Sequence, residues 1–101
     1  MKFDIEKQKI IDDAFAQELK HNSLLLLDYS EYYQDIGHKI NIQRLKLSSY
    51  KLGLDLSSQQ CYYIWRKFSE SKGTNRIMSV PAEEDDRTPL LDQAIHLYLN
   101  S

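Results

Sequence analysis

The sequence predicts an all-α protein, a compact bundle of four to five short helices with a long acidic loop before the C-terminal helix. Apolar residues recur every three or four positions along most of the chain, as they do on the buried face of a helix. Helix-capping residues precede several of these segments, and only two prolines and three glycines interrupt them. The chain has 101 residues, the usual length of one domain, so we expect residues 1–101 to share a single core.

The first two helices are expected in the acidic N-terminal part of the chain. Asp4 is a capping residue, and the four-residue spacing of apolar side chains behind it predicts a helix over about residues 4–21. Ser23 can cap a second helix, which contains the four leucines 24–27 and ends near Gly37. Four consecutive leucines are equally compatible with a buried strand, so this second element has two interpretations.

A basic helix pair is predicted over residues 41–71. Asn41 is expected to cap its first helix, and Gly53 is expected to end that helix in the left-handed conformation. A strand is a weaker alternative for the start of this segment. Ser57 and Gln60 form a capping box, in which the hydroxyl and the amide can each bond the other's free backbone N–H. The second helix of the pair therefore begins at this box.

The C-terminal part of the chain is expected to contain a long acidic loop over residues 72–87, which lacks helical periodicity. Thr88, a capping residue, precedes Pro89, which suits a first helical position, so a final helix is predicted over residues 88–99. The expected core takes apolar residues from all of these helices: Ile11, Phe15, Leu19, Leu26, Leu45, Leu52, Ile64, Trp65, Phe68, Leu91 and Ile95.

The net charge of −2 hides a strong segregation of charge along the chain. Residues 1–37 contain four lysines and eight acidic residues, and residues 77–101 contain one arginine and five acidic residues, so each of these segments carries −4. Residues 38–76 contain eight cations and two acidic residues, a net charge of +6. A cationic segment of this kind favours contact with a polyanion, provided that its cations gather on one surface.

The basic pair, joined by residues 53–56, resembles a helix-turn-helix unit over about residues 42–68. The connection before Ser57 is longer than usual, and Ser49 stands where a small apolar residue is commoner. In such units the second helix enters the major groove while nearby cations neutralise phosphates. The resemblance implies a regulatory protein that contacts nucleic acid or a nucleoprotein; the alternative is two packed helices with a solvated basic face. The expected contact residues are Arg44, Lys46, Lys51, Gln59, Tyr62, Tyr63, Arg66, Lys67 and Lys72.

A second interpretation is a protein-binding inhibitor or adaptor that uses tyrosines and acidic residues. Tyrosine offers a large contact area at low entropic cost, and carboxylates can imitate phosphates against a basic surface. In general character the chain resembles small phage-encoded regulators and inhibitors, including anti-defence proteins such as anti-CRISPRs. The tyrosine-rich second helix could instead pack in the core or mediate a homodimer. The expected contact residues are Tyr29, Tyr32, Tyr33, Glu83, Glu84, Asp85 and Asp86.

Catalysis is not expected from this sequence, and neither a metal nor a cofactor is implied. The three histidines, His21, His38 and His96, are far apart, and no glycine-rich phosphate loop is present. Cys61 lies on an apolar helical stripe, where a thiol is expected to be buried and inert. The longest apolar run, residues 24–27, is far shorter than the roughly 20 residues that cross a bilayer. We therefore expect a cytoplasmic protein that does not contact a membrane.

Overall fold

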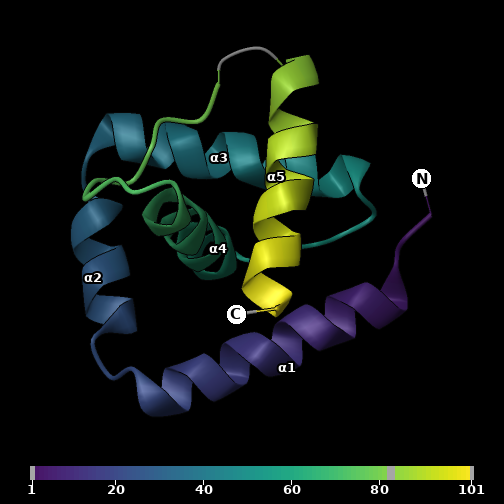
Figure 1. Cartoon of the computed structure of the whole chain (residues 1–101), viewed down its shortest axis with the longest axis horizontal. Coiled ribbons are helices and arrows are strands. Elements are labelled where there is room, and N and C mark those ends of the chain that lie inside the picture. Colours follow the sequence, from purple (N-terminus) through teal and green to yellow (C-terminus); the bar gives the residue numbers. More distant parts are fainter. Residues whose placement is uncertain (1, 82–83, 101) are drawn as a thin grey trace.

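The computed structural model describes residues 2–81 and 84–100. For residues 84–87 it describes the backbone only. This part of the chain forms five α-helices and contains no strand, which confirms the predicted fold class (Figure 1). The helices are α1 (Ile5–His21), α2 (Leu25–Tyr32), α3 (Ile36–Lys51), α4 (Ser58–Ser71) and α5 (Glu84–Leu99).

Helix α4 is the centre of the fold. Figure 1 looks almost along its axis, with α2, α3, α5 and α1 arranged around it. Eight of its 14 residues are buried, among them Trp65, the only tryptophan of the chain. Because α4 is covered on several sides, it contributes more side chains to the core than any other described helix. The buried apolar residues of α4 are Cys61, Tyr62, Tyr63, Ile64, Trp65 and Phe68.

The connection between α3 and α4 has the local structure that the sequence predicts. Gly53 has a φ of +78°, and the Ser57 hydroxyl accepts a hydrogen bond from the Gln60 backbone N–H at 3.1 Å. The Gln60 side chain accepts one from the Ser57 N–H at 2.8 Å, so the capping box is complete. The Gly53 carbonyl also accepts a hydrogen bond from the Asp4 N–H, which ties the N-terminal segment to this connection.

Helix α3 begins six residues earlier than predicted. Its cap is Asp35, whose carboxylate accepts a hydrogen bond from the His38 backbone N–H at 3.1 Å, and Gly37 lies in its first turn instead of ending α2. Asn41, the predicted cap, is buried inside α3, where its side-chain oxygen accepts a hydrogen bond from the Val80 N–H. The extra turn makes α3 a 16-residue helix.

Helix α2 is shorter than expected and buries a different leucine. The Ser23 side chain does not cap it; the residue before its first turn is Leu24, whose N–H donates to the Asn22 side chain. Only Leu25 of this helix is fully buried, so placing Leu26 in the core was wrong. Leu19, near the end of α1, is exposed as well, and Leu52 is only half-buried. The other predicted core residues are buried.

The segment before α5 is attached to the core, and α5 begins at Glu84 instead of Thr88. The predicted end of the loop at residue 87 was therefore wrong. Residues 84–86 of the acidic run belong to the first turn of α5, where negative charge is favourable. Within residues 72–81, the Met78 carbonyl accepts a hydrogen bond from the Trp65 indole N–H at 2.6 Å, and Val80 is buried. In the described part of the chain, no helix combines the length and apolar character that spanning a bilayer requires.

Candidate functional site

The helix expected to read nucleic acid is enclosed by the rest of the protein. Gln59 is half-buried. Tyr62 and Tyr63 are buried, so the prediction that these two residues project outward from α4 was wrong. Its physical reason is that α4 bears apolar or aromatic side chains on almost every side, and such a helix is stable only when covered. The residues of α4 that stay partly or fully exposed are polar, among them Gln59, Arg66 and Glu70.

The cations of α4 are engaged by acidic residues of the N-terminal segment. Arg66 Nη1 lies 2.9 Å from an Asp28 carboxylate oxygen, and Arg66 Nε lies 3.3 Å from Glu70. Burial opposes the charge of Arg66, but the hydrogen bond to Asp28 and its other partners outweigh it and raise the pKa of Arg66. Lys67 lies 3.8 Å from Glu18. These two cations stabilise contacts within the fold.

The cations of α3 lie on the part of the helix that faces away from the core. Lys39 and Lys51 are exposed, whereas Arg44 and Lys46 are half-buried at its sides. Helix α3 contains no aspartate or glutamate. Of the predicted nucleic-acid contacts, Arg44 and Lys51 lie along one side of α3 and Lys46 along the opposite side. Those on α4 lie in or against the core, and Lys72 lies over the Phe68 ring.

The tyrosines expected to form a contact patch instead pack between α2, α3 and α4. Tyr29 stacks on Tyr33 with a centroid distance of 5.2 Å and meets Tyr62 edge-on at 5.7 Å. Tyr32 stacks on the His38 ring at 3.9 Å. All three tyrosines of α2 and its end are half-buried, so they join helices within the protein. Of the acidic contact residues, Glu83 and the side chains of Glu84, Asp85 and Asp86 lie outside the described part.

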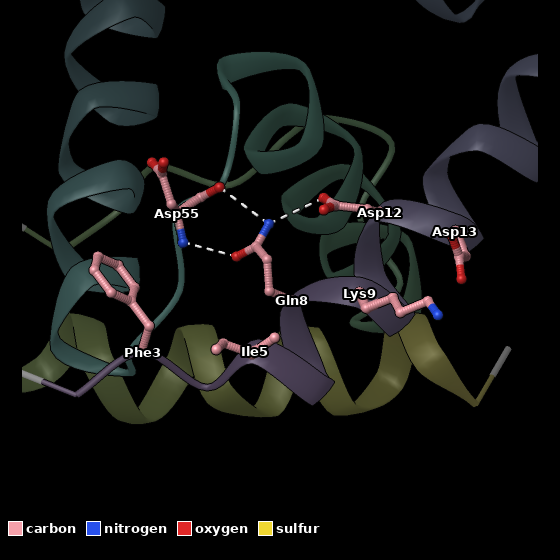
Figure 2. A pocket seen from close by; sticks show the side chains of 7 residues that line it. All are labelled: Phe3, Ile5, Gln8, Lys9, Asp12, Asp13 and Asp55. Atoms are coloured by element: carbon pink, nitrogen blue, oxygen red, sulfur yellow. Dashed lines mark hydrogen bonds between the residues drawn. The ribbon is translucent and has the colours of Figure 1, made fainter.

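A shallow hollow of about 530 Å³ lies between the start of α1 and the α3–α4 connection (Figure 2). At its centre, the Gln8 amide donates hydrogen bonds to Asp12 Oδ1 at 2.9 Å and to the Asp55 carbonyl at 3.1 Å. The Gln8 carbonyl oxygen accepts a third bond from the Asp55 N–H at 2.7 Å. Gln8 thus joins two elements, and the lining contains no histidine, cysteine, serine or threonine: Phe3, Ile5, Gln8, Lys9, Asp12, Asp13 and Asp55.

The groups that could support chemistry are not assembled into a site within the described residues. No three side chains of His, Cys, Asp or Glu come together there as metal ligands. Cys61 is buried, and this burial raises its pKa to about 12, so its thiol is protonated at neutral pH. The remaining candidates for a functional site among the described residues are exposed surfaces.

The most extended exposed apolar surface in the described part runs along α3. Ile36, Ile40, Leu47 and Tyr50 are 77%, 41%, 61% and 38% exposed, and Gln43 lies between them. Their successive spacings of four, three, four and three residues place all five on one side of the helix. We call these five residues the α3 outer face. The opposite side of α3 carries the buried Ile42 and Leu45, so the helix is apolar on two sides.

The α3 outer face was missed in the sequence because its pattern overlaps the core pattern. A helix that starts at residue 36 shows two separate apolar stripes, whereas only the stripe that faces the core was predicted from the sequence. A second exposed patch, Leu24, Leu26 and Leu27, occupies the start of α2 and spans about one turn. It does not extend along a helix.

Comparison with protein-family models, curated proteins and solved structures gave no match.

Proposed function

We propose that this chain is a non-enzymatic regulatory protein, an adaptor or inhibitor, that docks onto another protein through the α3 outer face. The observation that carries the proposal is the exposure of four large apolar side chains in one row along a folded helix. Burying a side chain such as Ile or Leu contributes about 1.5–3 kcal/mol. In the isolated chain most of this contribution is unused at Ile36 and Leu47 and part of it at Ile40 and Tyr50. Extended apolar surface of this kind marks interaction sites.

The arrangement of α3 supports docking over a purely structural role. Ile42 and Leu45 already attach α3 to the core, so the outer stripe is not needed to hold the helix in place. Isolated exposed apolar residues are ordinary on proteins, but a row that continues for 15 residues along one helix is not. This row provides a continuous contact for a partner.

Nucleic-acid binding through the basic helix pair receives less support and stays a prediction. The tyrosines that were expected to contact bases or phosphates are buried, and Arg66 and Lys67 face carboxylates. Of the predicted contact residues, Arg44, Lys46 and Lys51 flank exposed apolar side chains of α3, and those side chains would gain nothing from contact with phosphate.

A photo-crosslinking amino acid at position 47 tests the proposal in extract of the native host. We expect a discrete protein adduct that persists after nuclease treatment. The same amino acid at position 17, an exposed site on α1, is the matched control and should give no such adduct. Loss of the adduct on nuclease treatment, or equal adducts from both positions, would contradict docking through the α3 outer face.

A further inference from the structure

We propose that the segment bound by the α3 outer face is an amphipathic α-helix whose apolar seam is flanked by acidic residues. This inference deepens the proposed function and depends on it. It follows from two properties of α3: the spacing of the exposed apolar residues and the sign of the charges beside them.

The spacing is that of a coiled-coil seam. Alternating steps of four and three residues repeat every seven positions, the pattern by which one helix receives the side chains of another between its own. From Ile36 to Tyr50 the α3 outer face extends roughly 21 Å, at about 1.5 Å per residue. Gln43 places one amide in the middle of the seam, where a polar group can fix the register of a partner.

The positions that flank the seam are cationic on both edges. Lys39 and Lys46, seven residues apart, lie along one edge, and Arg44 lies along the other edge with Lys51 one heptad further on. These are the positions at which charges select the partner of a coiled-coil helix. Since no acidic residue occurs in α3, a partner helix that is acidic at its own flanking positions is complementary along the whole seam.

Of the described acidic residues near α3, Asp35 lies at its start, Asp55 lies beyond its end and Asp12 lies near Lys46. Asp35 caps the first turn, and Asp55 accepts a hydrogen bond from the Tyr50 hydroxyl at 3.3 Å. Lys46 shares a shallow hollow with Asp12 and Asp55. Arg44 Nη1 lies 3.5 Å from the Val80 carbonyl oxygen, a neutral partner.

A second copy of the chain does not fit this seam through the same face. Pairing two α3 helices, in either direction, sets the lysines and arginine of one against those of the other. Like charges at flanking positions oppose coiled-coil pairing. The α3 outer face is therefore adapted to a different, acidic helix.

Two synthetic three-heptad peptides test the charge requirement. Both carry leucine at the seam positions; one has glutamate and the other lysine at the flanking positions, and the like charges within each peptide discourage it from pairing with itself. In calorimetric titrations, we expect the acidic peptide to bind at least about tenfold more tightly than the basic one, with an affinity that falls as salt is added.

Variants of the full chain connect this binding to α3. Leu47→Glu should abolish it, and Lys39→Glu combined with Lys46→Glu should remove or reverse the preference for the acidic peptide. Lys9→Glu combined with Lys20→Glu makes the same change of net charge on exposed positions of α1 and should leave the preference intact. Circular dichroism of each variant verifies that it is folded.

The outcomes separate this inference from the proposed function. If position 47 crosslinks to a protein while the two peptides bind equally, or neither binds, the acidic-helix inference is refuted and docking stands. If sedimentation shows a dimer that Leu47→Glu dissociates, a second copy covers the seam and the inference is likewise refuted. If position 47 forms no protein adduct, both proposals fail.

Discussion

Two isoleucines on α3 make a matched pair for testing the two sides of this helix. Ile42 is 1% exposed and lies in the core, whereas Ile40, two residues earlier, is 41% exposed on the α3 outer face. Replacing either with alanine removes the same atoms and makes the same small gain in helix propensity. The difference between the two variants therefore reports burial alone.

The expected difference in stability is large. Ile42→Ala leaves a cavity in a packed core, which costs about 2–5 kcal/mol of unfolding free energy. Ile40→Ala acts on a side chain that water already reaches, and we expect a loss of less than about 1 kcal/mol. For a domain of about 100 residues, each kcal/mol corresponds to roughly 4–8 °C in Tm, so the two midpoints should differ by at least about 4 °C.

Urea unfolding followed by far-ultraviolet circular dichroism measures both variants against the parent protein. The acidic-peptide titration should show the reverse order, with Ile40→Ala weakening binding more than Ile42→Ala at temperatures where both are folded. Unfolding free energies that agree within about 0.5 kcal/mol would refute the assignment of one face to the core and the other to a partner.

Three further predictions concern the interior and its connections. Gly53→Ala should destabilise the protein more than Gly73→Ala, because both glycines have positive φ but only at Gly53 would a Cβ lie 2.7 Å from a backbone oxygen; equal losses in urea unfolding would argue against this close approach. The Cys61 thiol should react with a disulfide reagent only after unfolding, and rapid reaction of the native protein would contradict its burial. Burial raises the pKa values of Tyr63 and Tyr98 above 10 in the folded state. The contribution of these two tyrosines to stability is therefore intact below pH 10 and is lost as the pH rises further. Ionisation of all the tyrosines near pH 10 without loss of helix would refute this prediction.

The features of the fold that the sequence predicted well are those set by neighbouring residues. The capping box of Ser57 and Gln60, the cap at Asp4 and the left-handed Gly53 each require only a few adjacent positions, and all three are present. The start of α3 was predicted less well, because Asn41 was taken as its cap whereas Asp35, six residues earlier, caps the helix. The Asn41 side chain instead accepts a hydrogen bond from the backbone N–H of Val80, which lies 39 residues further along the chain.

The orientation of side chains was less predictable where every position is apolar or aromatic. Four consecutive leucines do not indicate which one faces the core, and contacts with α4 select Leu25. On α4, Tyr62 and Tyr63 have a hydroxyl that suits either water or an interior, so the polar side of this helix was misjudged. The same ambiguity concealed the α3 outer face, since apolar residues exposed for a partner are chemically identical to those that build a core.

The hydrogen bond from the Trp65 indole to the Met78 carbonyl allows tryptophan fluorescence to report on the segment that contains Met78. Because the chain has a single tryptophan, its emission comes from one place, and the segment over residues 72–81 forms part of the wall around that ring. Detachment of the segment would admit water to the indole and shift its emission to longer wavelength while the helices remain intact. A red shift that precedes the loss of helical signal would therefore measure the opening of this connection separately from global unfolding.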